Sequence, residues 1–452
     1  MATKPALLTL NLPDFIYFLR SRGISTFHAV YKPDARKFAT SHSALDPIVE
    51  YFRNEGRDFD SHEGIFGQIG PKSGVLQGAF IHRTCRGAGA GGVRNWTYRT
   101  VEDWFRDGLR LSRGMTHKNA LAGLWWGGGK GLLARNTGVG LGPGSKADDR
   151  KIVYEEYGSF MTALRGCYVT AEDVGTMDQD MAAMFSKTRF TTCIPHEFGG
   201  SGNPSEPTAR GVLRGLEAAL SYIGKSLEGA TIAVQGVGHV GIKLIEHLLR
   251  KEVSHIIASD IDSSRINLAA EQLRRWTASG RLRLESVLSR DDMILYEDVD
   301  ALAPCAVGGI LNPQTIPNIK AKVICGAANN QLNDLTSDDK LLAERGIIYV
   351  PDFLANRMGI VNCADEAVGY VDNDPNIEMH LGDSWDNSIY NLTKSILAES
   401  ARKNRTPQEL SIELAEQRSW EKNPIWGHRG IKIIDSLIRS REWNRKVNVE
   451  PQ

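Results

Sequence analysis

The 452-residue sequence has no excess of charge of either sign, because 54 lysines and arginines balance 54 aspartates and glutamates. Nucleic-acid-binding proteins usually carry a basic excess, so the composition argues against nucleic acid as a partner. No apolar run approaches the ~20 residues of a membrane-spanning helix, which argues against a membrane role. The N-terminal segment lacks the basic and long apolar regions of a secretory signal, so we expect a cytoplasmic protein. Its low acid content leaves a transit peptide as the alternative, although the pattern LNLPDFIYFL favours a folded helix.

Cysteine is also sparse, with six residues scattered along the chain and no C-x-x-C pair. Zinc-ribbon spacing is therefore absent, and we predict no metal site. Free thiols in a reducing compartment explain this usage most simply.

The chain is too long for one ordinary core, which predicts two domains. A buried strand is expected at 75–82, followed by amphipathic helices at 100–123 and 152–166. Beyond residue 200, short apolar strands alternate with helices; these strands are expected at 231–235, 255–262, 299–306, 322–328 and 347–353. This alternation predicts an α/β fold in which a parallel sheet is covered on both faces.

The sequence GVGHVG follows the strand at 231–235 and opens a helix, which is the context of a dinucleotide-binding turn. The candidate residues of this turn are Gly236, Gly238, His239, Val240 and Gly241. The first glycine permits a sharp turn, the second leaves room for a pyrophosphate, and the third lets helix and strand pack closely. The helix N-terminus then offers N–H groups to the phosphates. The alternative is a glycine turn that only connects the two elements.

Asp260 ends the next strand, about twenty residues beyond the first glycine of the motif. A carboxylate there would accept hydrogen bonds from the ribose hydroxyls and repel a 2′-phosphate. The sequence therefore predicts NAD, rather than NADP, as the cofactor.

A third stretch, HKNALAGLWWGGGKG, places Lys118 and Lys130 on either side of an apolar run that ends in glycines. We expect the glycines to form a turn that brings the two ammonium groups into one half-buried cleft. Each charge, together with desolvation, would then lower the pKa of the other lysine toward the range of a usable base. Asp173 follows a predicted strand and would stay ionised beside the lysines. The alternative is two solvated surface lysines.

Several segments in this order resemble the glutamate/leucine/phenylalanine/valine dehydrogenase family, most closely its leucine/phenylalanine/valine branch. They include GAGAGGVR, the lysine–glycine stretch, YVTAEDVGT, GGSGNPSEPTARGV, VQGVGHVG, VICGAANNQL and PDFLANRMGIVNCADE. The resemblance implies NAD-dependent, reversible oxidative deamination of an L-amino acid to a 2-oxo acid and ammonia by a homo-oligomer. It also implies a Rossmann domain, residues 200–356, inserted into a catalytic and oligomerisation domain, residues 1–199 and 357–452, with a cleft between them.

The resemblance further implies roles for single residues. Lys118 would bind the substrate carboxylate, helped by the Gly92 backbone and by Asn329 or Asn330. Lys130 would be the catalytic lysine that assists water and imine chemistry, and Asp173 would handle proton transfer and the substrate ammonium. On the cofactor side, Thr208 would contact the nicotinamide carboxamide, and Asn329 is a further candidate contact.

Five positions would line the substrate side-chain pocket by the same resemblance: Ala90, Met115, Ala171, Leu354 and Arg357. Relatives usually carry a larger aliphatic residue in place of Ala90, so an enlarged pocket for an apolar or aromatic side chain is expected. Arg357 replaces an apolar residue and would point to solvent, pair with an internal acid or meet an acidic substrate. The last option gives a glutamate-type alternative. A catalytically idle NAD-binding relative is a third interpretation. The joint presence of the two lysines, Asp173 and Asn329 argues against it.

Overall fold

The computed structural model describes residues 4–288, 293–440 and 443. Contacts divide the chain into two compact units, each described here by itself. Unit 1 comprises residues 1–203, 363–370 and 416–452, and unit 2 comprises residues 204–362 and 371–415. Among the described residues, none of the helices combines the length and the hydropathy needed to cross a membrane.

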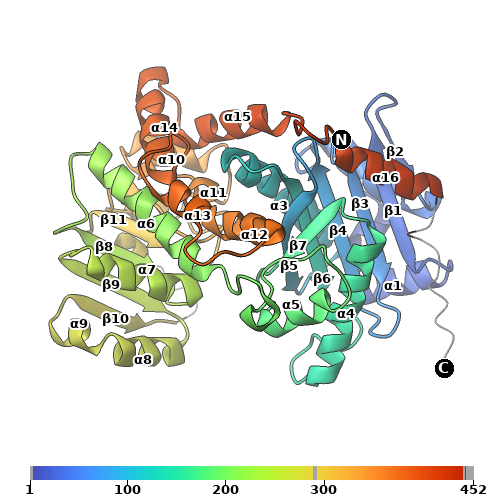
Figure 1. Ribbon diagram of the computed structural model, residues 1–452, viewed down its shortest axis with the longest axis horizontal. Helices are drawn as coiled ribbons and strands as arrows, with labels where there is room; N and C mark the ends of the chain where they lie inside the picture. Colours follow the sequence, from blue (N-terminus) through green and yellow to red (C-terminus); the bar gives the residue numbers. More distant parts are fainter. Residues whose placement is uncertain (1–3, 289–292, 441–442, 444–452) are drawn as a thin grey trace. The chain divides into compact units, whose positions relative to one another are not determined.

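Unit 1 is built on a seven-stranded mixed sheet in the order β2-β1-β3-β4-β6-β5-β7 (Figure 1). Its strands are β1 Thr26–Lys32, β2 Lys37–Thr40, β3 Gly64–Ile69, β4 Leu76–Arg83, β5 Gly89–Trp96, β6 Gly127–Ala134 and β7 Tyr168–Ala171. The pairs from β2 to β6 are antiparallel, whereas β5 runs parallel to both β6 and β7. The parallel strands therefore end at the same edge, where β7 runs directly into the segment that carries Asp173.

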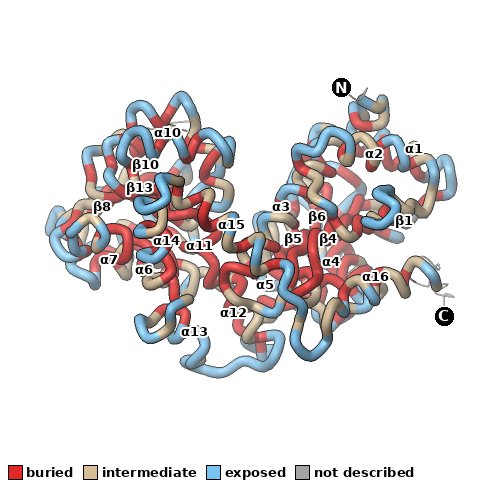
Figure 2. Tube along the Cα trace, turned by 90° about the horizontal axis from the view of Figure 1, so that it is seen from above, coloured by how far each residue is buried: buried red, intermediate tan, exposed pale blue. Residues whose placement is uncertain are grey.

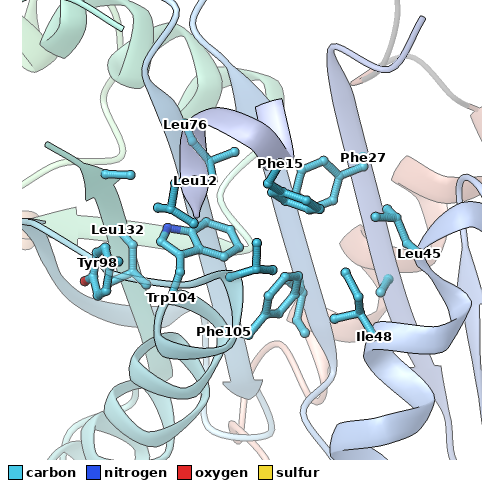
Figure 3. Packing of buried hydrophobic residues seen from close by; sticks show 14 of the residues in the cluster. Leu12, Phe15, Phe27, Leu45, Ile48, Leu76, Tyr98, Trp104, Phe105 and Leu132 are labelled. Carbon is cyan, nitrogen blue, oxygen red and sulfur yellow. The ribbon is translucent and has the colours of Figure 1, made fainter. Parts of the chain in front are cut away.

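The helices assigned mainly to unit 1 are α1 Leu12–Arg20, α2 Asp46–Glu55, α3 Val101–Leu121, α4 Ala147–Ala163, α5 Asp178–Phe185 and α16 Arg429–Ser440. Helix α3 begins where the sequence predicts, because Thr100 and Asp103 form a reciprocal capping box. Its Trp104 and Phe105 pack against Phe80 of β4 in a buried aromatic cluster. Figure 3 shows Trp104 and Phe105 in the same apolar cluster as residues of α1 and of the sheet, among them Leu12 and Leu132.

Unit 2 contains the predicted parallel sheet, in the order β10-β9-β8-β11-β12-β13. Its strands are β8 Thr231–Gln235, β9 His255–Asp260, β10 Leu282–Ser286, β11 Ala301–Pro304, β12 Val323–Ile324 and β13 Ile348–Tyr349. In the central strand β8, the consecutive residues Ile232, Ala233 and Val234 are all buried. Figure 2 shows how the buried parts of the chain are distributed. Since neighbouring side chains point to opposite faces of a sheet, both faces are covered.

The helices that lie wholly or mainly in unit 2 are α6 Ser205–Tyr222, α7 His239–Arg250, α8 Ser263–Gln272, α9 Arg274–Ala278, α10 Asp338–Glu344, α11 Asp352–Ala355, α13 Pro375–Leu381, α14 Ile389–Lys403 and α15 Pro407–Ser419. Helix α14 packs on α6, and Thr406 donates a hydrogen bond to Asp339. Residues 371–415 therefore pack with unit 2, although the sequence-based boundaries place them with the catalytic domain. Helix α12 (Met358–Val368) carries the chain from unit 2 back into unit 1.

Candidate active site

The glycines before Lys130 form a strand and not the predicted turn. Gly127, Gly128 and Gly129 lie in the buried strand β6, between β4 and β5. A Cβ on Gly128 would lie 2.0 Å from Thr116 Oγ1 and 2.4 Å from the Ser112 carbonyl. The glycines therefore let α3 pack closely on β6, and this packing places Lys130 in the interior of unit 1.

Lys130 and Asp173 form a buried ion pair, with Lys130 Nζ 2.8 Å from Asp173 Oδ2. The lysine is 4% exposed. Arg94 of β5 donates through Nε to the same Asp173 oxygen at 3.2 Å. Three neighbouring elements, β5, β6 and the segment after β7, thus bring two cations and one anion together.

A further carboxylate holds Arg94 in place. Asp107 of α3 lies 3.3 Å from Arg94 Nη1 and accepts a 2.7 Å hydrogen bond from the Tyr98 hydroxyl. The sequence reasoning missed Arg94, Asp107 and Tyr98. Arg94 stands within GAGAGGVR, two residues after Gly92 and so on the same face of β5, and this spacing is the signal that could have found it.

The electrostatics of the cluster keep Asp173 ionised and make Lys130 easier to deprotonate. Burial raises the pKa of Asp173, but the charges of Lys130 and Arg94 outweigh it and hold that pKa well below its usual range. Burial lowers the pKa of Lys130, and Arg94 adds to this effect against the opposing charge of Asp173. The cation that crowds Lys130 in these contacts is Arg94, whereas the sequence argument assigned this effect to Lys118.

The predicted substrate-side residues of unit 1 lie on the elements around Lys130. Lys118 is half-buried in the last turn of α3, the helix that packs on β6. Ala90 is fully buried on β5, next to Gly128 of β6 in the ladder. The remaining members are Met115 on α3, Gly92 on β5 and Ala171 at the end of β7. A Cβ on Gly92 would lie 2.7 Å from the Asp173 Cβ, so only glycine leaves room for the turn that carries the carboxylate.

Glu172 is a second acidic residue beside the ion pair that the sequence reasoning did not assign. Asn203 Nδ2 donates to both of its carboxylate oxygens, at 3.0 and 3.2 Å. Burial and the neighbouring Asp178, Asp173 and Asp180 raise the pKa of Glu172 to about 7. This carboxyl therefore changes its charge near neutral pH.

In unit 2, the glycine motif forms the connection between β8 and α7. Gly236 has φ +95°, a conformation that L side chains rarely adopt. A Cβ on Gly241 would lie 2.0 Å from the Gly236 carbonyl oxygen. Gly238 is more open, since the nearest atom to an added Cβ is 3.4 Å away. Gly238 caps helix α7, whose first residues are His239 and Val240.

Asp260 ends β9 beside this turn. Its Oδ2 accepts a hydrogen bond from Val237 N at 2.8 Å, and its Oδ1 accepts one from Asp262 N at 2.9 Å. These bonds hold the carboxylate at the glycine turn, and each oxygen keeps lone pairs for a further donor. Arg265 Nη1 lies 3.9 Å from the Asp260 carboxylate and was not recognised in the sequence.

The other predicted residues of unit 2 lie on three segments: the loop at 329–330, helix α11 and helix α6. Asn329 Oδ1 accepts a 2.9 Å hydrogen bond from Asn356 Nδ2, and Asn330 adopts φ +53°. Leu354 is fully buried on α11. Thr208 Oγ1 donates to the Pro204 carbonyl at 2.7 Å, in the first turn of α6.

Arg357 is fully buried, so it does not point to solvent. Its Nη2 donates to the Asn387 carbonyl and lies 3.3 Å from His380 Nδ1. Burial and the guanidinium charge lower the pKa of His380 to about 3, so this imidazole is neutral at physiological pH. These contacts favour internal pairing of Arg357, with a carbonyl and an imidazole among its partners.

The parallel sheet with its glycine turn, together with the buried lysine–aspartate pair of the other unit, defines a two-unit α/β oxidoreductase of the dehydrogenase class. Two family models match the chain: "Glu/Leu/Phe/Val dehydrogenase, dimerisation domain" over residues 72–190 and "Glutamate/Leucine/Phenylalanine/Valine dehydrogenase" over residues 199–423. The chain therefore belongs to the glutamate/leucine/phenylalanine/valine dehydrogenase family of NAD(P)-dependent enzymes and is an amino-acid dehydrogenase.

Individual relatives agree with this assignment. A leucine dehydrogenase of Geobacillus stearothermophilus is 41% identical over 69% of this chain and 80% of its own length. A valine dehydrogenase of Streptomyces coelicolor is 35% identical over 81% of this chain and 94% of its own. The crystal structure of L-tryptophan dehydrogenase from Nostoc punctiforme matches with a TM-score of 0.63 and 31% identity, covering 82% of this chain and 98% of that one.

Proposed function

We propose that the protein catalyses the NAD-dependent, reversible oxidative deamination of an L-amino acid with an apolar or aromatic side chain. The products are the 2-oxo acid, ammonia and NADH. The observation that carries the proposal is the buried Lys130–Asp173 pair, 2.8 Å apart, in a chain of this family. Bound NAD supplies the acceptor for the hydride that leaves the substrate Cα.

Lys130 and Asp173 have different proposed roles: the lysine transfers protons, and the aspartate stabilises positive charge. The lowered pKa of Lys130 makes its neutral amine accessible, and Nζ can take a proton from the water that attacks the imine carbon. The same Nζ then returns the proton to the amino group that leaves as ammonia. Asp173 stays ionised, so it can stabilise the substrate ammonium and the lysine ammonium that forms during the reaction.

Lys118 and the Gly92 backbone are proposed to bind the substrate carboxylate. The position of Lys118 in the last turn of α3 supports this role, because α3 packs directly on the strand of Lys130. A point charge there would orient the substrate without taking part in proton transfer.

The residues around β8 suit a dinucleotide. Gly236 makes the turn, Gly238 leaves the backbone open at the start of α7, and Asp260 is held beside them. The turn would hold the pyrophosphate through Gly236, Gly238, His239, Val240 and Gly241. Asp260 would bind the ribose hydroxyls. The nicotinamide end would be contacted by Thr208 and Asn329. The Asp260 carboxylate favours NAD, since it would repel a 2′-phosphate.

The names of the relatives and one substitution support the substrate class. The matched relatives are named for leucine, valine and tryptophan, all of which have apolar or aromatic side chains. Ala90 has no side chain beyond Cβ and is proposed to widen the substrate pocket beside Met115 and Ala171 of the same unit. The internal contacts of Arg357 weaken the glutamate-type alternative. We also propose a homo-oligomer, because the model matched by residues 72–190 describes a dimerisation domain.

The proposal is tested by assaying a panel of L-amino acids and 2-oxo acids. The absorbance of the reduced cofactor measures oxidative deamination and reductive amination, and each direction is compared with the NAD and the NADP couple. We expect kcat/KM to be highest for aliphatic or aromatic substrates with NAD. A strong preference for glutamate would reverse the substrate assignment, and a preference for NADP would mean that Arg265 outweighs Asp260 in cofactor choice.

A further inference from the structure

Two of the six cysteines lie in contact in the interior of unit 1. Cys193 Sγ is 3.3 Å from Cys363 Sγ, and the two residues are 0% and 2% exposed. A disulfide bond is about 2.05 Å long, so bond formation requires the sulfur atoms to approach by only about 1.2 Å.

The backbone around Cys193 is held by the helix that carries Cys363. Glu366, one turn further along α12, accepts hydrogen bonds from Cys193 N and Ile194 N, both at 2.8 Å, and from Ser201 Oγ at 2.6 Å. Cys193 itself has φ +59°, a conformation that favours glycine. These bonds fix the relative position of the two thiols in the absence of any covalent link.

The position of the pair in the chain gives it a specific consequence. The segment 204–362 belongs to unit 2, and Cys193 and Cys363 stand in unit 1 on either side of it. A bond between them would link the chain shortly before this segment to the chain directly after it. The loop that it closes is long, since the two cysteines are 170 positions apart. Cross-links that close long loops constrain the unfolded chain strongly.

We propose that Cys193 and Cys363 form a redox-modification site, in which a hydroperoxide converts the dithiol to a disulfide. One thiolate attacks a peroxide oxygen and hydroxide leaves, which gives a sulfenic acid. The second sulfur attacks the S–OH sulfur, water leaves, and the disulfide forms. Two thiols and one hydrogen peroxide thus give one disulfide and two waters.

Burial sets the conditions for this reaction. The contact with Cys363 and burial raise the pKa of Cys193, which keeps the thiol protonated and unreactive while the surrounding segment is folded. Oxidation therefore proceeds through local openings of the segment around Cys193. The pair should react more slowly than an exposed thiol and should then retain the product disulfide.

The test is a thiol count on the full-length, fully reduced protein before and after hydrogen peroxide. The unfolded, reduced chain should bind six maleimides, and the oxidised chain four, with Cys193 and Cys363 protected in peptide maps. The intact mass should fall by two hydrogen atoms, dithiothreitol should restore all six thiols, and the disulfide should raise the Tm. The unreduced oxidised chain should also migrate faster on a denaturing gel, because a long loop is closed.

Cys193→Gly is the principal control, since it removes one thiol and suits the positive φ. It should bind five maleimides with or without peroxide. Cys325→Ala removes a different buried thiol and should still lose two thiols on oxidation, from five to three. Retention of all six thiols in the wild type after prolonged exposure overturns the proposal. So does a loss of two thiols in Cys193→Gly, or oxidation of Cys193 alone to a sulfinic acid.

Discussion

Lys130 Nζ lies 2.8 Å from Asp173 Oδ2, and both side chains are withdrawn from solvent. Isolated burial would push each group toward its neutral form. Their contact opposes this change, because each charge stabilises the other. The positive charge of Arg94 lowers the pKa of both groups, so the carboxylate stays ionised and the lysine is easier to deprotonate. This arrangement supports the proposed roles, in which Lys130 acts as the base and Asp173 stays ionised beside it.

Lys130→Ala should lower kcat by about 10²–10⁴-fold or more, because the proton acceptor for water is lost. NAD binding, followed by fluorescence titration, should remain, since the glycine turn belongs to unit 2. Lys151→Ala, at an exposed position of α4, is the matched control and should leave turnover unchanged. Loss of NAD binding in Lys130→Ala would mean that the lysine serves the cofactor or the fold.

Arg94→Met should destabilise the protein by about 3–5 kcal/mol, because Asp107 and Asp173 would lose a shared cation in a largely buried setting. The pKa of Asp173 should rise as well. This carboxyl has a lowered folded-state pKa in the wild type, so its stabilising effect is present above its unfolded pKa and is lost as the pH falls. Because the variant lacks part of this effect at every pH, its deficit in unfolding free energy should be largest near neutral pH and should shrink in acid. Urea unfolding at several pH values measures both effects. Arg99→Met, at an exposed site, should stay within about 0.5 kcal/mol of the wild type.

Glu172 should make the stability fall as the pH rises toward neutrality. Its folded-state pKa of about 7 lies above the unfolded value of 4.5, so between these values the unfolded chain has released a proton that the folded chain retains. Stability from this group is fully present below pH 4.5 and is lost as the pH rises through 7, by at most about 3 kcal/mol.

Glu172→Gln removes this titration, while its amide oxygen can still accept from Asn203. The difference in unfolding free energy between variant and wild type should therefore favour the variant more at pH 8 than at pH 5. An equal difference at both pH values would show that Glu172 titrates at its ordinary pKa.

Most strands and helices of unit 2 could be predicted from the sequence, because their alternation is visible as local patterns of apolar and polar residues. The parallel sheet and the context of the Gly236 turn follow from segments of a few residues each. The glycines before Lys130 were misassigned to a turn, since their close neighbours, such as Thr116 and Ser112, come from another element. Arg94 and Asp107 were missed for the same reason: their contact depends on how α3 lies against β5.

The contacts of Arg357 could not be predicted either. Solvent exposure, internal pairing and substrate contact are equally compatible with one arginine in a sequence. The choice depends on His380 and Asn387, which follow it in the chain by 23 and 30 positions. Local patterns cannot supply such partners.

Gly128→Ala should unfold the protein or destabilise it by more than about 3 kcal/mol, because the added methyl meets backbone atoms of α3 that cannot move independently. Gly114→Ala is the matched control: it lies exposed on the same helix, and no atom stands within 4 Å of the added methyl. It should stabilise the protein by about 1 kcal/mol. Thermal unfolding of both variants compares the two. Equal stability of Gly128→Ala and the wild type would contradict the close packing of α3 on β6.

Ala90→Leu should shift substrate preference from aromatic toward small aliphatic amino acids. The residue is fully buried on β5, beside the strand of Lys130, and a larger side chain there would fill space proposed for the substrate. The added carbons also cost stability, so the absolute rate is a poor readout. The ratio of kcat/KM for phenylalanine to that for valine is independent of the fraction of folded enzyme. This ratio should fall by about 10-fold or more, as expected for a pocket that loses the volume of several methylenes. If both substrates lose kcat/KM in equal proportion, Ala90 contributes to the core alone and the pocket is lined by other residues.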